Sequence, residues 1–349
     1  MRAADAAADS RTPVHILTGF LGSGKTTLLR RLLADPALAD TAVIINELGE
    51  VGLDQLLVRE VAEDVVLLSS GCLCCTVRDD LLSTLADLDR MRLNGEIPPF
   101  SRAVVETTGL ADPAPIMQAL LSERRLASRF RLGQIVTAVD GLNCDTTLAA
   151  HREARQQLGM ADRLVLTKCD LIDASTRESL VDKLGALNVN ATVRTSGSGG
   201  ETVAELLADV DAAWHRLPSA PVDASAQAVR NHGHDHDAGH VHDGTIGTFT
   251  VTLSEAVEWE PFVEWLELLL YSRGDSILRV KGLLHVVGDD LPVVVQGVQH
   301  VLYPPEHLPA WPGTTRSGWI VFIARNLTRS SIESALRFLT EASPVTAPS

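Results

Sequence analysis

The sequence predicts an α/β fold in two parts, a doubly wound and mostly parallel sheet followed by a smaller α+β domain. Between residues 13 and 217, short apolar runs rich in β-branched residues alternate with segments of helical periodicity, which is typical of strands buried on both faces. From residue 246, strand patterns follow one another closely, which predicts an antiparallel sheet. A length of 349 residues also exceeds the usual size of one hydrophobic core.

The individual elements follow from these patterns. The predicted strands of the first domain are VHILT, AVIIN, VVLLS, RAVVE, QIVTAVD, RLVLTK and ATVRT. In the second domain we predict the strands IGTFTVTLS, ILRVKGLLHVV, LPVVVQGVQHVLY and GWIVFIAR, a helix VEWEPFVEWLELLL, and a last helix from about Ser330. The second domain is predicted to span residues 246–340. Three further segments lack a periodic apolar pattern, and we assign them to a disordered N-terminus (1–12), a His-rich linker (218–245) and a C-terminal tail (341–349).

Composition excludes several classes of protein. The formal net charge is -15, which argues against binding to nucleic acid or to anionic membranes. No stretch approaches 18 uninterrupted apolar residues, and the first residues lack the apolar run of a signal peptide. We therefore expect a cytoplasmic protein, in which clustered cysteines favour a metal or redox site over disulfides.

The clearest functional motif is a phosphate-binding loop. The segment GFLGSGKTT contains the pattern G-x-x-x-x-G-K-[ST] from Gly19 through Thr26, between a predicted strand and a predicted helix. Its glycines let backbone N–H groups turn toward phosphate oxygens, Lys25 supplies positive charge, and the Thr26 hydroxyl can bind Mg²⁺. The motif in this setting predicts a P-loop nucleoside triphosphatase.

A second motif indicates which base is bound. The segment TKCD places Thr167, Lys168 and Asp170 in the spacing of the guanine-reading N-K-x-D motif, with Thr167 where Asn is usual. A carboxylate at Asp170 can accept the N1–H and the 2-amino hydrogens of guanine, whereas adenine lacks both donors. GTP is favoured, although the alternative of an ordinary charged strand end remains at this stage.

The segment ETTGLADP follows another predicted strand at the edge of the sheet where α/β ligands bind. We expect Glu106 to hold Mg²⁺ or its waters, and Gly109 to let the backbone approach the γ-phosphate. The alternative for Glu106 is a helix-capping or solvated acid.

Three cysteines in the segment GCLCC are the strongest sign of a metal site. Cys72, Cys74 and Cys75 lie within four positions of a chain that has 5 cysteines. Thiolates select Zn²⁺ or Cu(I), so we favour a metal site over a thiol redox switch or incidental buried cysteines. Cys144 and Cys169 each stand alone, and packing is expected for both.

A second cluster of metal-binding side chains lies in the linker. Imidazoles at this density suit Zn²⁺, Ni²⁺ or Co²⁺, but a flexible segment cannot impose a geometry. We expect a weak, exchangeable metal collector, the alternative being a solvated polar linker. The candidate ligands are His232, His234, His236, His240 and His242.

Taken in order, these motifs resemble one family. GFLGSGKTT, INELGEVGLD, GCLCC, ETTGLADP and TKCD, followed by ILRVKGLL, VQGV and FIARNL, are similar to segments of the CobW-type GTPases, a family of zinc-regulated metallochaperones, over residues 12 to 340. The resemblance implies a GTPase that binds Zn²⁺ through its C-x-C-C cysteines, changes switch conformation with GTP and passes the metal to a client metalloprotein. Cys72, Cys74 and Cys75 are the implied zinc ligands.

The resemblance also implies roles in the nucleotide site. Glu47 is similar to a switch acid near the metal and the γ-phosphate, and Lys25, Glu47 and Glu106 are the expected catalytic residues. Thr26, Glu47 and Glu106 are the expected metal contacts on the nucleotide side. The implied contacts to phosphate and Mg²⁺ are Gly22, Ser23, Gly24, Lys25, Thr26 and Thr27.

The main hypothesis is slow GTP hydrolysis that gates zinc delivery, with GTP, Mg²⁺ and Zn²⁺ as cofactors. Two alternatives remain at this stage. One is cobalt handling for cobalamin synthesis or for activating a cobalt or iron enzyme, and the other is a zinc buffer or sensor without turnover. We assign client recognition to the second domain, which has no evident catalytic constellation, and regard homo-oligomerisation as compatible with the sequence.

Overall fold

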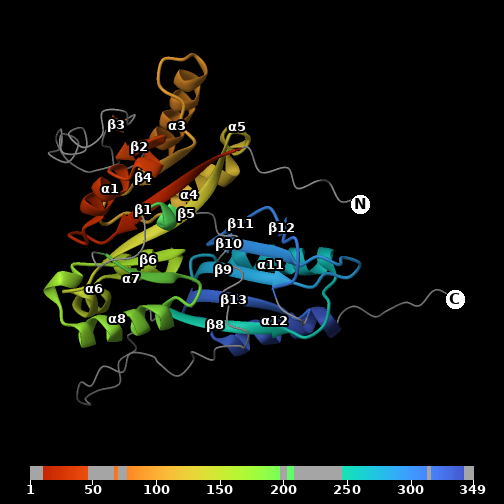
Figure 1. Cartoon of the computed structure of the whole chain (residues 1–349). Coiled ribbons are helices and arrows are strands. Elements are labelled where there is room, and N and C mark those ends of the chain that lie inside the picture. The colour runs from red at the N-terminus through yellow and green to blue at the C-terminus, as the bar shows by residue number, and fades with distance from the viewer. Residues whose placement is uncertain are drawn as a thin grey trace. The chain divides into compact units, whose positions relative to one another are not determined.

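The computed structural model describes residues 11–45, 67–69, 77–196, 203–207, 246–312 and 316–341. The chain divides into two compact units, Met1–Val181 with Thr192–Val210 and Asp182–Ala191 with Asp211–Ser349. Each unit is built around one sheet (Figure 1).

The first unit contains the predicted parallel sheet, and every predicted strand of this domain contributes to it. Its strands are parallel throughout and lie in the order β3-β2-β4-β1-β5-β6-β7. On one side of β1 the chain runs out through β2 to β3 and returns as β4 between β1 and β2, and on the other side it runs out through β5, β6 and β7. The doubly wound α/β fold is thereby confirmed. The strands are β1 (Thr12–Gly19), β2 (Thr41–Ile45), β3 (Leu67–Ser69), β4 (Arg102–Glu106), β5 (Phe130–Asp140), β6 (Arg163–Thr167) and β7 (Thr192–Thr195).

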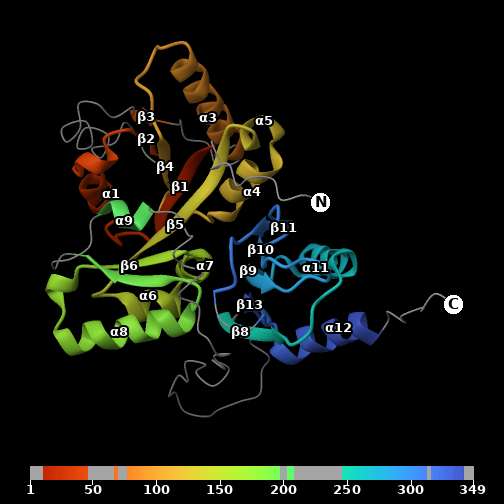
Figure 2. The ribbon, with the colours of Figure 1, turned by 45° about the vertical axis from the view of Figure 1, so that its right-hand side comes forward.

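Helices cover both faces of this sheet. In Figure 2, α1 and α9 lie on one face, and α3, α4 and α5 lie on the other. The helices are α1 (Lys25–Leu33), α3 (Val77–Leu93), α4 (Ala114–Ser122), α5 (Arg124–Ala127), α6 (Cys144–Ala150), α7 (Arg152–Met160), α8 (Ala174–Leu187) and α9 (Val203–Leu207), with the 3-10 turns η1 (Pro36–Leu38) and η2 (Cys169–Leu171).

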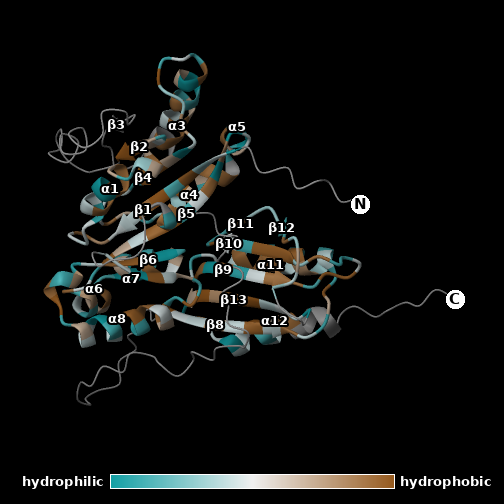
Figure 3. Cartoon of the chain, in the orientation of Figure 1, coloured by the Kyte–Doolittle hydropathy of each residue, from teal (hydrophilic) through white to brown (hydrophobic). Residues whose placement is uncertain are grey.

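Helix α1 is anchored by leucines at helical spacing. Leu28, Leu29, Leu32 and Leu33 are buried and pack on the sheet together with α9. Burying a leucine side chain contributes roughly 1.5–3 kcal/mol to the free energy of unfolding. The four leucines therefore hold α1, including its N-terminus, against the sheet. The central strands carry hydrophobic stretches in Figure 3, interrupted in β5 by polar residues of its first half.

The register of the parallel strands gathers the functional motifs at one edge of the sheet. Leu17 of β1 pairs with Glu106 of β4, and Asp140 of β5 pairs with Thr167 of β6. The carboxyl ends of these strands therefore meet beside the loop that follows β1. This edge is where ligands bind in open α/β sheets.

The second unit has the predicted antiparallel sheet, with strand order β11-β10-β9-β13-β8 and β12 on β10. The first strand, β8, pairs with the last, β13, because α11 carries the chain away before β9 begins. The elements are β8 (Ile246–Leu253), α11 (Trp259–Arg273), β9 (Ile277–Leu284), β10 (Val293–Val298), β11 (Val301–Leu302), β12 (Glu306–His307), β13 (Gly318–Arg325) and α12 (Arg329–Glu341).

One face of this second sheet forms a core with α11 and α12. Phe249 and Phe322 stack across β8 and β13 with ring centroids 5.5 Å apart. Phe262 and Leu266 of α11 and Ile332 of α12 pack in the same cluster. Along β8 and β13, alternate residues such as Phe249 and Val251, and Ile320 and Phe322, therefore belong to this core.

One predicted strand is divided in the structure. The run LPVVVQGVQHVLY forms β10 and β11, which pair with each other as a hairpin. The turn falls at Gln299, whose φ is 49°, a left-handed conformation. Gln-His is not a strong turn sequence, so the apolar alternation on either side masked the reversal.

The limits predicted for the linker, 218 and 245, lie outside the described residues and stay predictions. At the two ends, β1 begins at Thr12 and α12 continues to Glu341, each one residue beyond the predicted domain limits. In the part of the chain that the structure describes, no helix combines the length and hydrophobicity needed to cross a membrane.

Candidate functional site

The loop between β1 and α1 has the backbone that the phosphate motif requires. Gly19, Gly22 and Gly24 have φ values of 144°, 71° and 87°, a region that favours glycine. At Gly19 a Cβ atom would also lie 2.4 Å from the carbonyl oxygen of Ala138 on β5. All three glycines are therefore favoured by backbone conformation and Gly19 also by close packing, and Gly24 is the N-cap of α1.

Lys25 lies over this loop. Its Nζ donates to the carbonyl oxygens of Gly19 at 2.9 Å and Phe20 at 3.2 Å. The ammonium group is thereby fixed within the loop by the loop's own backbone. A fixed cation beside the N-terminus of α1 suits an anionic phosphate, because the exposed N–H groups and the helix dipole favour negative charge at the same place.

Thr26 and Glu106 meet beside the phosphate loop. The Thr26 hydroxyl donates to Oε1 of Glu106 at 3.0 Å, although the two residues are 80 positions apart. Glu106 is 5% exposed, so this carboxylate is not a solvated surface acid. A hydroxyl and a buried carboxylate are oxygen ligands of the kind that Mg²⁺ prefers. The residues present fit the predicted Mg²⁺ site.

Thr167 links the base motif to the phosphate loop. Its hydroxyl lies 2.7 Å from the carbonyl oxygen of Ser23, to which it donates, and 3.1 Å from that of Val139. Thr167 is buried at the end of β6. The residue that replaces the usual Asn therefore uses its hydroxyl to hold the two loops together.

Lys168 adopts a left-handed backbone that the sequence did not indicate. Its φ is 54°, and its Nζ donates to Oδ2 of Asp140 at 2.7 Å. Burial raises the pKa of Asp140, but hydrogen bonds from Lys168 and Asn143 outweigh it, so the pKa lies below its usual value. Asp140 is therefore charged at neutral pH and fixes the lysine next to the base motif.

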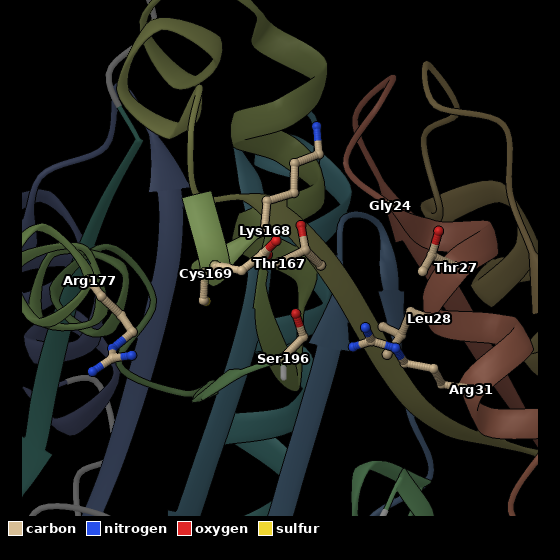
Figure 4. Close-up of a pocket in the computed structure, with 10 residues that line it drawn as sticks. Gly24, Thr27, Leu28, Arg31, Thr167, Lys168, Cys169, Arg177 and Ser196 are labelled. Carbon is tan, nitrogen blue, oxygen red and sulfur yellow. The ribbon is translucent and has the colours of Figure 1, made fainter. Parts of the chain in front are cut away.

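A cavity of about 460 Å³ opens between α1, η2 and the end of β7 (Figure 4). Asp170 lines it and is exposed, so its carboxylate can meet a ligand. Arg31 of α1 and Arg177 of α8 line opposite sides, and Ser196 follows β7. The two arginines were not predicted, because single arginines on helices resemble solvated surface charges. They give an acidic protein a locally basic pocket suited to an anionic nucleotide.

Cys169 lines the same pocket and behaves as the predicted packing residue. Its thiol is buried and donates to the carbonyl oxygen of Leu166 at 3.2 Å. Burial raises the pKa of the Cys169 thiol, so it stays protonated and is a poor metal ligand. Cys144 is also buried, as expected for a packing residue.

Asp170→Asn is expected to lower the affinity for GTP at least about 10-fold, because hydrogen bonds to a charged partner each contribute roughly 1.5–3 kcal/mol. The same change should improve binding of xanthosine triphosphate, since Asn can donate to the 2-oxo group of xanthine. Asp182→Asn, an exposed acid farther along α8, is the matched control. Competition titrations measure the affinity of each variant for GTP and for xanthosine triphosphate. Equal binding of ATP and GTP by the unchanged protein would contradict the base assignment.

Gly109 lies where the loop after β4 touches the phosphate loop. A Cβ atom at Gly109 would lie 2.6 Å from Leu21 Cδ2 and 2.8 Å from the Leu21 backbone, so only glycine permits this approach. The carbonyl oxygen of Gly109 accepts a hydrogen bond from Gln157 of α7. The structure thus brings Gly109 next to the phosphate loop and reveals a glutamine that the sequence did not single out.

Two groups of predicted site residues lie outside the described residues. One comprises Glu47, Cys72, Cys74 and Cys75, in the interval between β2 and α3. The other is the linker cluster from His232 to His242. Among the residues that the structure does describe, no group of three or more His, Cys, Asp or Glu side chains could hold a metal ion.

Comparison with known families and proteins covers nearly the whole chain. Residues 13–195 match the family described as CobW/HypB/UreG, nucleotide-binding domain, and residues 246–339 match the cobalamin synthesis protein cobW C-terminal domain. The zinc chaperone YjiA of Escherichia coli is 33% identical over 92% of this chain and 96% of its own length. The zinc-regulated GTPase metalloprotein activator 1 of Schizosaccharomyces pombe is 32% identical over 91% of this chain and 84% of its own length.

A solved structure supports the same similarity. The Zn(II)-bound YjiA GTPase from E. coli superposes with a TM-score of 0.68 and 29% identity, covering 94% of this chain and 99% of that one. The match extends across both units, so it concerns the complete two-part architecture and not the nucleotide-binding fold alone.

Proposed function

Because the chain belongs to the CobW/HypB/UreG family of nucleotide-binding proteins, we propose that it is a GTP hydrolase that binds Zn²⁺ and transfers it to a client metalloprotein. Hydrolysis of GTP to GDP and phosphate would switch the zinc site between a holding and a releasing state. The observation that carries the nucleotide part is one continuous site, in which Thr167 joins the base motif to the phosphate loop.

The described residues supply the parts that GTP binding needs. Lys25 neutralises the β- and γ-phosphate oxygens, and Asp170 accepts hydrogen bonds from guanine. Lys168 borders the base pocket from a position fixed by Asp140. Gly22, Ser23, Gly24 and Thr27 complete the phosphate contacts as proposals from their place in the motif.

Hydrolysis depends on the polar groups beside the γ-phosphate. Thr26 and Glu106 would hold Mg²⁺, which supplies charge neutralisation on the phosphate oxygens when bound. Glu106 orients the hydroxyl of Thr26, and its burial keeps competing water away. Gly109 presents its backbone to the γ-phosphate. We assign Glu47 a switch role and infer slow turnover, because a carrier must keep GTP until it meets its client.

Cys72, Cys74 and Cys75 are the proposed zinc ligands. They lie in the sequence between β3 and α3, in the interval from the phosphate loop to Glu106 where nucleotide switches rearrange. Three closely spaced thiolates suit Zn²⁺, which keeps an open position when only three protein ligands bind it. The names of the relatives, zinc chaperone and zinc-regulated GTPase metalloprotein activator, support zinc as the cargo.

The remaining parts have supporting roles in this proposal. The linker histidines His232, His234, His236, His240 and His242 would collect zinc weakly and exchange it. The second unit, with its antiparallel sheet, would recognise the client in the cytoplasm.

The proposal is tested by steady-state GTP hydrolysis of the purified full-length protein without a polyhistidine tag. We expect turnover that requires Mg²⁺, is slow, and changes when Zn²⁺ is added or removed by a chelator. A zinc buffer with a merely structural nucleotide site would bind both ligands without hydrolysis. Absence of Mg²⁺-dependent phosphate release, in protein that binds GTP, would overturn the enzymatic part of the proposal.

A further inference from the structure

The loop of residues 107–112, which we name the Gly109 loop, runs from the end of β4 toward α4. Two hydrogen bonds join its start to β1. The Thr107 N–H donates to the carbonyl oxygen of Leu17 at 2.9 Å, and the Thr107 hydroxyl donates to the hydroxyl oxygen of Thr18 at 2.8 Å. At Gly109 it touches Leu21 of the phosphate loop so closely that no side chain fits. Any shift of this loop therefore changes its distance from the nucleotide phosphates.

Gln157 of α7 ties the middle of the Gly109 loop. Its side chain is 1% exposed, and its Nε2 donates to the carbonyl oxygens of Gly109 at 3.1 Å and Ala111 at 3.0 Å. Both N–H groups of this amide thus donate to the same loop. Since both neighbours are carbonyl oxygens, the nitrogen must face the loop.

Only the nitrogen end of this buried amide makes hydrogen bonds among the described residues. Its Oε1 is buried and accepts no hydrogen bond from the described residues. A buried polar atom without a partner costs free energy, but an apolar side chain here would leave the carbonyl oxygens of Gly109 and Ala111 without this donor. The compensating gain is control over the position of the Gly109 loop.

Helix α7 is itself fixed against the nucleotide side of the sheet. The Thr137 hydroxyl of β5 donates to the main-chain oxygen of Gln157 at 3.0 Å. At the other end of the helix, His151 stacks on Phe20 of the phosphate loop, with ring centroids 4.3 Å apart. Gln156 donates to Oδ2 of Asp112 at the end of the Gly109 loop. The helix thus contacts the phosphate loop and the Gly109 loop together.

From this arrangement we infer that Gln157 is a positioning residue that holds the Gly109 loop at the γ-phosphate and so determines the preference for GTP over GDP. The inference rests on the proposed GTP hydrolysis. GDP lacks the γ-phosphate, so its binding depends on the phosphate loop and the base pocket, whereas the two hydrogen bonds from the Gln157 amide go to the Gly109 loop. Release of the Gly109 loop would weaken only the contacts that GTP alone makes.

The test is Gln157→Met, which keeps the length of the side chain and removes both donors. Affinity for a non-hydrolysable GTP analogue and kcat should each fall about 10-fold, the effect of losing two neutral hydrogen bonds, while affinity for GDP changes less than about 2-fold. Hydrogen exchange of the 107–112 amides should become faster. Gln118→Met on α4 is the matched control and should leave the ratio of GTP to GDP affinity unchanged.

Gln156→Met is the second variant, and it keeps the test informative if Gln157→Met does not fold. It removes the donor to Asp112 and should lower GTP-analogue affinity in the same direction by a smaller factor. Equal losses for GTP analogue and GDP, or an unchanged ratio in folded variants of a parent that hydrolyses GTP, would overturn the positioning role. A parent without hydrolysis would instead refute the proposed function, so the two failures are distinguishable.

Discussion

Lys25→Ala is expected to lower the affinity for GTP at least about 100-fold, because in the proposed site the lysine would make charge-assisted hydrogen bonds to phosphate that contribute roughly 1.5–3 kcal/mol each. GDP affinity should fall as well, since the β-phosphate is shared by both nucleotides. The fold should survive, because the hydrogen bonds from the Nζ of Lys25 to the carbonyl oxygens of Gly19 and Phe20 lie within the loop itself. Fluorescent nucleotide titration measures the loss, and thermal unfolding checks the fold.

A matched control for this change is Lys183→Ala, a lysine of α8 that does not line the described pocket. It should retain GTP affinity. Lys25→Arg is informative too, because a planar guanidinium keeps the charge but not the compact shape of the ammonium, so binding should be restored only in part. Unchanged GTP affinity in Lys25→Ala would refute the phosphate-loop assignment.

The double change Cys74→Ser with Cys75→Ser is expected to remove the tight zinc site while leaving zinc-free GTP binding nearly intact. Serine has a similar size, but its hydroxyl stays protonated near neutral pH, whereas a coordinated thiol is deprotonated. Zinc affinity should fall at least about 1000-fold, because metal-thiolate sites supply much of their binding free energy through these ligands. Competition against a chromophoric chelator measures it.

The same variant separates ligand loss from misfolding. In the absence of zinc, its GTP affinity and its thermal unfolding should match those of the parent. Zinc should no longer change its rate of GTP hydrolysis. A variant that keeps tight zinc binding would show that the linker histidines, and not the cysteines, form the main site.

The sequence was sufficient to predict the architecture, because its signals are local. Short apolar runs such as RAVVE, alternating with helical segments, are typical of buried strands in a parallel sheet, and β4 occupies that run from Arg102 to Glu106. The phosphate loop was equally predictable, since its glycines are required by backbone conformation at each position. Thr26 and Glu106 were each predicted to contact Mg²⁺, and the structure adds the hydrogen bond between them at the edge where the carboxyl ends of parallel strands meet.

The features that were missed depend on contacts between distant segments. Gln157 sits in an ordinary helical pattern, and only the folded structure shows that its amide reaches Gly109 and Ala111. Arg31 and Arg177 become a pair only when α1 and α8 face the same cavity. The role of Thr167 changed for the same reason, because its partner Ser23 is 144 positions away.

The central claim is that nucleotide and zinc bias the same switch, and zinc affinity measured in three nucleotide states tests it most directly. Isothermal titration of Zn²⁺ into the GTP-analogue, GDP and nucleotide-free forms should give affinities that differ between the first two by about 5- to 150-fold, the usual range of allosteric coupling. Linkage requires zinc to change the ratio of GTP-analogue to GDP affinity by the same factor. Identical zinc affinity in all three forms would show that the two sites act independently and would contradict the metallochaperone mechanism.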